Sequence, residues 1–295
     1  MPLSVSVITP SYNQGRFLER TLRSVLEQNY PRLEYLVMDG GSRDESVEIL
    51  RRYSGRLAAW VSEKDRGQAD AVNKGLARAT GEIIGWLNSD DVFYPGAIAA
   101  ASDFFARHPE ADVVYGDGHH IDACDQVIEP YPTEDWDFER LKERCFLCQP
   151  AVFFRRRVVE RFGPLGVQWQ YTLDYEYWLR LGKGGARFAR LRGVLAGSRL
   201  HADTKTLGSR VKVHAETNAM LKATFGRVPD RWLFNYAHAV LDARGVPRSD
   251  RLRFAAGVST LACWTALRWN RRISPAMLRL SGAWVGGALR DAVRR

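Results

Sequence analysis

Short β-rich runs alternate with amphipathic helical segments through the first 115 residues, and this alternation restricts the fold more than any other feature. The helical segments cover residues 14–28, 44–53, 68–79 and 95–107, between strand-like runs at 5–8, 35–38, 57–62, 82–87 and 112–115. Successive strands joined by helices need crossover connections. The pattern therefore predicts an α/β fold in which a mostly parallel sheet carries helices on both faces.

The rest of the chain is less regular. Residues 117–145 resemble an irregular or hairpin segment, 174–181 a helix, and 182–208 loops with short strands. From Val211 the pattern is helical, with breaks at Pro229, Pro247 and Pro275.

Polar residues follow the carboxyl ends of the predicted strands, where open α/β sheets bind their ligands. In Asn88-Ser89-Asp90-Asp91 two adjacent acids follow an apolar strand. Such a pair is costly unless it meets a cation or a helix N-terminus. A hard divalent ion bound by one or two carboxylates and phosphate oxygens fits this pattern. The alternative is that Asp91 only caps the helix near Pro95.

Two further strand ends could approach a ligand closely. In Asp39-Gly40-Gly41-Ser42 the acid could accept hydrogen bonds from a base or ribose; an ordinary turn, with Ser42 and Glu45 as a capping box, is the alternative. Segment 65–75 predicts a helix with a small, polar face, which also suits tight packing on a sheet. The chain has no GxGxxG, P-loop or GxSxG motif, which removes the main support for a dinucleotide, ATPase or hydrolase fold.

Taken in order, segments 5–13, 39–42, 65–75, 79–81 and 87–91 resemble the signature of family 2 glycosyltransferases, which are inverting enzymes of the GT-A fold that use a nucleotide-diphospho-sugar. The resemblance implies a GT-A type nucleotide-sugar-binding sheet flanked by helices. It places a catalytic domain at 1–210, with a nucleotide-sugar half at 1–116 and an acceptor half at 117–210. Residues 211–295 would form a C-terminal α-helical appendage.

The resemblance also implies binding roles. Residues expected to contact the nucleotide-sugar are Thr9, Pro10, Tyr12, Asp39, Asp65, Arg66, Gly67, Asn73, Asn88, Ser89, Gln149 and Lys205. Asp90, with Asp91 as alternate and His201 as a late partner, would hold Mg²⁺ or Mn²⁺. Asn88 departs from the family pattern, which has an acid there; its amide oxygen could still accept a ribose or water hydrogen bond. A structural histidine at 201 and a solvated lysine at 205 are the alternatives for those two positions.

Inversion needs a general base that deprotonates the acceptor hydroxyl. The corresponding segment is Thr172-Leu173-Asp174-Tyr175-Glu176, in which Leu173 replaces the usual glutamate. Asp174 is therefore the expected base and Glu176 the second choice. A helix N-cap is the alternative role for Asp174.

The positive charge is confined to one end of the chain. Residues 244–295 hold eleven arginines against two aspartates, which equals the net charge of +9 for all 295 residues. Apolar residues lie between these arginines at helical spacing, and Trp264, Trp269 and Trp284 suit a headgroup interface. We expect amphipathic helices on an anionic inner membrane leaflet. The alternative is an appendage that packs on the catalytic body.

The lack of a recognisable targeting signal and the pattern of cysteines predict a cytoplasmic protein. The basic C-terminal segment predicts that it is peripheral at the membrane. No signal peptide or membrane-spanning segment is recognisable, and the four cysteines form neither a disulfide framework nor a zinc pattern. The expected activity is sugar transfer to a glycan or lipid-linked acceptor in bacterial surface polysaccharide assembly.

Two other functions fit the sequence less well. A sugar-phosphate nucleotidyltransferase would carry a Gly-rich, Arg-containing loop after the first strand, which residues 9–15 lack. A polyanion-binding protein acting through the basic tail conflicts with the acids at the strand ends, which repel phosphate without a metal. No nucleic-acid partner is therefore expected.

Overall fold

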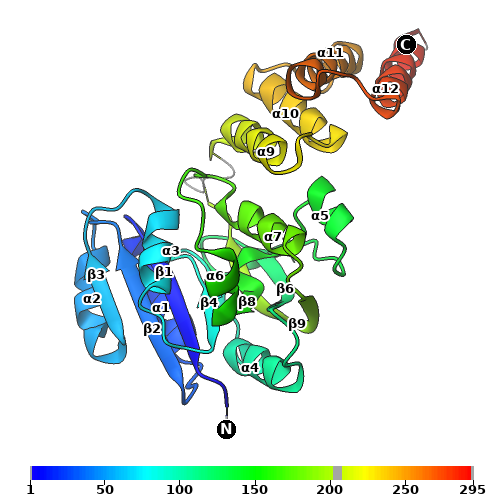
Figure 1. Ribbon diagram of the computed structural model, residues 1–295. Helices are drawn as coiled ribbons and strands as arrows, with labels where there is room; N and C mark the ends of the chain where they lie inside the picture. The colour runs from blue at the N-terminus through cyan, green and yellow to red at the C-terminus, as the bar shows by residue number, and fades with distance from the viewer. Residues whose placement is uncertain (1, 202–207, 294–295) are drawn as a thin grey trace. The chain divides into compact units, whose positions relative to one another are not determined.

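The computed structural model describes residues 2–201 and 208–293 and divides the chain into two compact units, Met1–Thr204 and Lys205–Arg295. Each unit is described by itself. The first contains all the strands of the described residues, and the second consists of helices (Figure 1).

A nine-stranded sheet forms the first unit, with the order β3-β2-β1-β4-β8-β6-β9-β5 and β7 paired to β6. The strands are β1 (Val5–Ser11), β2 (Leu33–Asp39), β3 (Ala59–Ser62), β4 (Ile83–Trp86), β5 (Val92–Phe93), β6 (Val113–Ile121), β7 (Val127–Pro130), β8 (Val152–Arg155) and β9 (Phe188–Arg199). The first four are parallel, as the βαβ pattern predicted. Their carboxyl ends lie at one edge, because Ser11 pairs with Asp39 and Asp39 with Ser62.

Helices connect and cover these strands: α1 (Gly15–Leu26), α2 (Ser46–Tyr53), α3 (Gln68–Leu76), α4 (Ala97–Arg107), α5 (Phe138–Glu143), α6 (Arg156–Phe162) and α7 (Leu173–Lys183), with 3₁₀ turns η1 (Ser54–Arg56) and η2 (Gln149–Ala151). The apolar stripe of α1 is buried through Phe17, Leu18, Leu22 and Val25. Helix α3 packs closely on β1, where a Cβ at Gly75 would lie 2.4 Å from the Ile8 side chain. The small residues of α3 thus serve packing on the sheet.

The second half of the sheet differs from the mostly parallel prediction. Strand β8 inserts antiparallel between β4 and β6, so the strand at 112–115 does not lie beside β4. Residues 182–208, predicted as loops and short strands, contain the twelve-residue β9, which runs parallel to β6. Strand order depends on long-range pairing, which local periodicity does not encode.

The predicted capping box at Ser42 and Glu45 is wrong. Helix α2 begins at Ser46, whose backbone N–H is bound by the Asp44 carboxylate at 3.1 Å. The Ser42 hydroxyl instead donates to Asp39 and accepts from the backbone N–H of Asn13. Ser42 therefore joins the loops after β1 and β2 and does not cap a helix.

The second unit contains α9 (Arg210–Phe225), α10 (Asp230–Ala243), α11 (Arg251–Asn270) and α12 (Pro275–Val293). Pro229 and Pro247 lie between helices, and Pro275 is the first residue of α12, as their sequence positions predicted. Trp284 of α12 packs on Phe234 of α10 with ring centroids 5.2 Å apart. Within the described residues no helix has the length and apolar character that a membrane crossing needs.

Candidate active site

The two acids of the loop after β4 have opposite environments. The Asp91 residue is only 4% exposed, and one of its carboxylate oxygens accepts the backbone N–H of Arg199 at 2.8 Å. Burial, followed by the adjacent charge of Asp90, raises the pKa of Asp91 well above its ordinary value. Asp91 thus secures the end of β9 from inside the protein and is not turned toward a ligand.

Asp90 is the carboxylate that faces outward. Its Oδ2 lies 3.1 Å from Nε2 of His201, which follows β9. A carboxylate oxygen and an imidazole nitrogen are both ligands for Mn²⁺, and carboxylate oxygen is the preferred protein ligand of Mg²⁺. No cluster of three or more potential metal ligands occurs within residues 2–201 and 208–293, so this pair would leave the other coordination positions to water and a diphosphate.

A buried arginine, which the sequence analysis missed, holds this loop in place. The Arg199 side chain is fully buried; its Nε donates to the backbone oxygen of Asp90 at 2.6 Å, and it forms an ion pair with Asp125. Its guanidinium stacks over the Phe17 ring at 4.9 Å, and the His201 ring lies 4.8 Å from the same ring. Phe17 is therefore a platform beneath both the loop anchor and the histidine. No local motif signals Arg199, because its partners are distant in the sequence.

The Asn88 amide is fully hydrogen-bonded within the protein. Its Oδ1 accepts from Gln68 at 2.7 Å and from the indole N–H of Trp86 at 2.9 Å, while its Nδ2 donates to Asp91 and to Gln149. All four hydrogen-bonding positions of the amide are occupied. Gln149 is likewise committed, because its Nε2 donates to the backbone oxygen of Trp86. Both residues hold the loop in place, and their assignment as nucleotide-sugar contacts stays a prediction.

Replacing Asn88 by aspartate, which restores the acid of the family pattern, is expected to destabilise the protein by about 2–4 kcal/mol, because two donors are lost and a new charge faces Asp91. Thermal unfolding measures the effect, as a midpoint lowered by roughly 5 °C or more. Asn13→Asp is the matched control, since Asn13 uses its side-chain oxygen to accept from Arg43. An unchanged midpoint for Asn88→Asp, or equal losses for both variants, would contradict this role.

The loops after β1 and β2 form the neighbouring wall. Asp39 is 2% exposed, and its carboxylate accepts from the backbone of Gly41 and Ser42 and from the Ser62 hydroxyl. Its predicted contact with a base or ribose stays a prediction. Thr9 is also buried, and its hydroxyl bonds that of Tyr35 at 3.0 Å.

At the end of β1, Tyr12 is open to a ligand, and the buried Ser11 beside it carries a hydroxyl that is unpaired among the described residues. Tyr12 is 59% exposed and lies two residues after the buried Pro10. A ring has to be exposed in this way if it is to stack on a nucleobase. Ser11, which the sequence analysis did not single out, is 4% exposed, and its hydroxyl has no hydrogen-bond partner in the described part of the chain. An unpaired buried hydroxyl is costly, so a bound ligand that pairs with it gains affinity.

The turn before α3 is shaped by short contacts. Gly67 has φ of +111°, its N–H is bound by Asp65 at 2.8 Å, and a Cβ there would lie 3.0 Å from Oε1 of Gln170. Arg66 is exposed and forms an ion pair with Asp70 at 2.7 Å. The hydrogen bond from Arg66 lowers the pKa of Asp70. The turn lies beside the loop that leads into α7.

Asn73 was expected to bind the nucleotide-sugar, yet it pins that same loop. Its amide exchanges two hydrogen bonds of 2.9 Å with the backbone N–H and C=O of Leu165. This contact across 92 residues joins α3 to the segment before α7. Asn73 thus positions the segment before α7, and its predicted contact with the nucleotide-sugar stays a prediction.

Asp174 and Glu176 have different surroundings in the structure. Glu176 is 8% exposed and forms a two-point ion pair with Arg180 at 2.9 and 3.2 Å. Asp174 is the second residue of α7, inside the helix and not at its cap, which is Thr172. Burial raises the pKa of the Cys148 thiol, and the charges of Asp91 and Asp174 raise it further. The charges of the loop after β4 and of the first turn of α7 thus act on the same thiol.

Ser89, Lys205 and the cysteines are the remaining residues that the sequence singled out. Ser89 is buried, and its backbone oxygen accepts from the Thr21 hydroxyl of α1 at 2.9 Å. Lys205 lies outside the described residues. All four cysteines are free.

Comparison with known proteins decides the family. The profile of glycosyl transferase family 2 matches residues 6–163, more than half of the chain, and covers the loops after β1 to β4. The chain belongs to glycosyl transferase family 2. The resemblance inferred from the motifs is thereby confirmed, and the protein is a glycosyltransferase.

Relatives agree with this assignment. The glycosyltransferase is 28% identical over 201 residues to a PGL/p-HBAD biosynthesis glycosyltransferase of Mycobacterium tuberculosis, covering 65% of this chain and 75% of the relative. It is 34% identical over 180 residues to an uncharacterised glycosyltransferase of the same species, covering 60% and 68%.

Solved structures confirm the GT-A type fold. TarS of S. aureus with UDP-GlcNAc superposes with a TM-score of 0.62 at 15% identity, over 98% of this chain and 90% of that one. The mannosyltransferase PcManGT of Pyrobaculum calidifontis with GDP-Man and Mn²⁺ gives 0.60 at 21% identity, over 98% and 81%.

Proposed function

We propose that this glycosyltransferase moves a sugar, with inversion at the anomeric carbon, from a nucleotide-diphospho-sugar to an acceptor hydroxyl. The observation that carries the proposal is the outward Asp90 facing His201 beside the ends of the parallel strands, 3.1 Å apart, while Asp91 is turned inward. A nucleotide would lie against Tyr12 and Ser11, with its diphosphate toward Asp90, His201 and the exposed Arg66.

Asp174 supplies the base. The positive end of the α7 dipole stabilises its carboxylate in the charged form that accepts a proton. The acceptor oxygen gives its proton to Asp174 and forms a bond to the anomeric carbon. The bond from that carbon to the diphosphate oxygen breaks, and its electron pair leaves with the nucleoside diphosphate. Glu176 is not suited to this step, because Arg180 neutralises it.

The leaving group needs positive charge. Asp90 and His201 present the oxygen and nitrogen that would hold Mg²⁺ or Mn²⁺, and such an ion would neutralise the charge developing on the diphosphate. The buried Arg199 keeps Asp90 facing His201 by binding the backbone oxygen of Asp90. Preorganisation of this kind avoids reorganising the loop during the reaction.

The acceptor is proposed to be a glycan or lipid-linked glycan of bacterial surface polysaccharide assembly, reached from the cytoplasmic face of the membrane. Two observations support this. A relative is named for PGL/p-HBAD biosynthesis, and the second unit is basic and rich in exposed apolar residues. No specific observation favours a nucleotidyltransferase or a nucleic-acid binder.

A thermal-shift screen with UDP, GDP, dTDP and their sugars, with and without Mn²⁺, tests the proposal. UDP- and GDP-sugars lead the screen because TarS and PcManGT were solved with them. At 100-fold excess over Kd a ligand stabilises by about 2.7 kcal/mol, which raises the midpoint by roughly 5 °C or more. Stabilisation by one base with Mn²⁺ supports the proposal. No shift with any nucleotide, or equal shifts for ATP and the diphospho-sugars, would count against it.

A further inference from the structure

The end of the α11–α12 hairpin carries an exposed patch in which arginines and large apolar side chains are mixed. We call this the basic corner; its members are Trp264, Leu267, Arg268, Arg271, Arg272, Leu278 and Arg279, all classed as exposed. Trp264, Leu267 and Leu278 are 55%, 51% and 55% exposed. We propose that the basic corner is a docking surface for an anionic lipid bilayer.

The geometry of α11 gives this surface one face. Trp264, Leu267 and Arg268 are spaced i, i+3 and i+4, so they share one side of the helix, and Arg271 follows directly as the residue that ends it. The Arg268 guanidinium lies over the Trp264 ring at 5.9 Å. The opposite side is buried through Val258, Ala262, Thr265 and Ala266. Helix α11 therefore has its own core face, and the exposed stripe is a second face that points outward.

Charge identifies the occupant. Between Asp250 and Asp291 the sequence has seven arginines and no acid. The described structure shows no ion pair for the four arginines of the basic corner, whereas Arg248 is paired with Asp242. The corner therefore presents uncompensated positive charge to a polyanion. Exposed tryptophan and leucine among those arginines favour lipid headgroups and acyl chains over nucleic acid, whose phosphates gain nothing from leucine.

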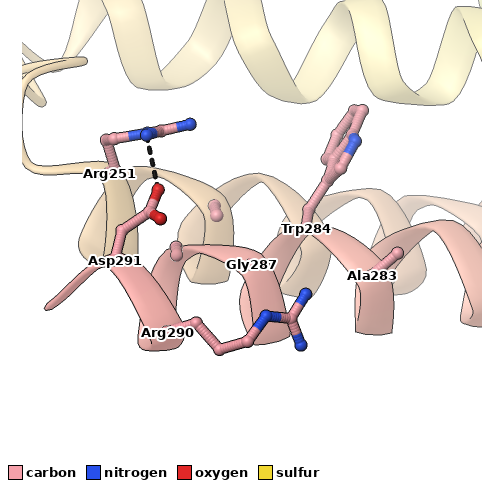
Figure 2. Close-up of a pocket in the computed structure, with 8 residues that line it drawn as sticks. Arg251, Ala283, Trp284, Gly287, Arg290 and Asp291 are labelled. Atoms are coloured by element: carbon pink, nitrogen blue, oxygen red, sulfur yellow. Dashed lines mark hydrogen bonds and ion pairs between the residues drawn. The ribbon is translucent and has the colours of Figure 1, made fainter. Parts of the chain in front are cut away.

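The other end of the hairpin does not fit this role. A groove of about 410 Å³ lies there between α11 and α12, with Trp284 and Arg251 among its lining residues. Arg251 is held by Asp291, and Figure 2 shows Arg290 extending away from both Arg251 and Trp284. An anion would compete with Asp291, and Trp284 is packed on α10. Of the three tryptophans expected at a headgroup interface, Trp264 is the one the structure exposes most.

This inference rests on the proposed function only in taking the acceptor to be at a membrane, and its test uses neither donor nor acceptor. Sedimentation of the full chain with vesicles of phosphatidylcholine containing 30% phosphatidylglycerol should recover it in the pellet. Vesicles of phosphatidylcholine alone should not. Binding should weaken in 0.5 M NaCl, because salt screens the arginines. A nucleotide thermal shift on the same sample reports the donor site separately.

Matched charge reversals locate the surface. Arg271→Glu with Arg272→Glu should weaken binding at least about 20-fold, since each basic residue near the membrane contributes about fivefold. Arg244→Glu at the end of α10 with Arg253→Glu in the first turn of α11 makes the same charge change on two other exposed arginines, and should weaken binding much less. Trp264→Ser should reduce binding where Leu289→Ser does not.

Several results would overturn the inference. These are an absence of vesicle binding by the wild-type chain, equal losses for the two double variants, and unchanged binding after Arg271→Glu with Arg272→Glu. Equal competition by duplex DNA and by anionic vesicles would point to a nucleic-acid surface instead. Circular dichroism of each variant separates loss of binding from loss of folding.

Discussion

Asp174→Asn is expected to reduce sugar transfer by about 10³-fold or more while leaving donor binding unchanged. The asparagine amide keeps the size of the side chain and its place in the first turn of α7, but it does not accept the proton of the acceptor hydroxyl. Turnover with the donor identified by the thermal-shift screen measures the first quantity. The nucleotide-induced shift of the variant measures the second.

Glu176→Gln is the control for that experiment. It removes a carboxylate two residues away whose charge is neutralised by Arg180, so it should lower the unfolding temperature and leave the turnover of the folded protein within about tenfold of wild type. Near-normal turnover of Asp174→Asn would disprove the assignment of the base. A larger loss for Glu176→Gln than for Asp174→Asn would move the base to Glu176.

Asp90→Ala is expected to lower transfer at least about 100-fold and to abolish the extra stabilisation that Mn²⁺ gives with the nucleotide. The physical reason is that Asp90 is the carboxylate of its loop that faces His201, so its loss removes the charged partner of a cation at the leaving diphosphate. Metal titrations of turnover and of the thermal shift measure both effects.

The neighbouring aspartate provides the contrast. Asp91→Asn keeps an oxygen for the Arg199 N–H and resembles the protonated carboxyl that burial favours at this position. We expect it to retain metal-dependent transfer. If Asp91→Asn lost the Mn²⁺ effect and Asp90→Ala kept it, the roles of the two acids would be reversed.

The sequence predicted the first half of the fold well, because each βαβ unit is local. Strand β1 and helix α1 are recognisable from the periodicity of Val5, Val7, Leu18 and Leu22, which are all buried. The position of β8 and the length of β9 were missed, since their pairings with β4 and β6 join segments far apart in the sequence. The family motifs, in contrast, are contiguous and identified the enzyme class without a structure.

Motif positions and side-chain roles diverged at the site. Thr9, Asp39 and Asn88 lie at or near the ends of the parallel strands, as their motifs imply, yet their side chains bond neighbouring strands and loops. Asn73 in α3 and Gln149 in η2 likewise bond the backbone of other segments. A motif records that a residue type is needed at a position. Whether its polar atoms face a ligand or a neighbouring loop depends on which donors and acceptors the fold brings within 3 Å.

The amino-acid sequence by itself determined the family, the strand-end loops that form the site and the concentration of all net charge in the last 52 residues. These features are local or additive along the chain. Only the tertiary structure decided that Asp90 faces outward while Asp91 is buried, that Arg199 and His201 meet the same loop from β9, and that Arg180 neutralises Glu176. It also decided which arginines of α11 and α12 remain without an acidic partner in the described residues. Burial and partner choice are set by packing across the whole fold, and no short stretch of sequence specifies them.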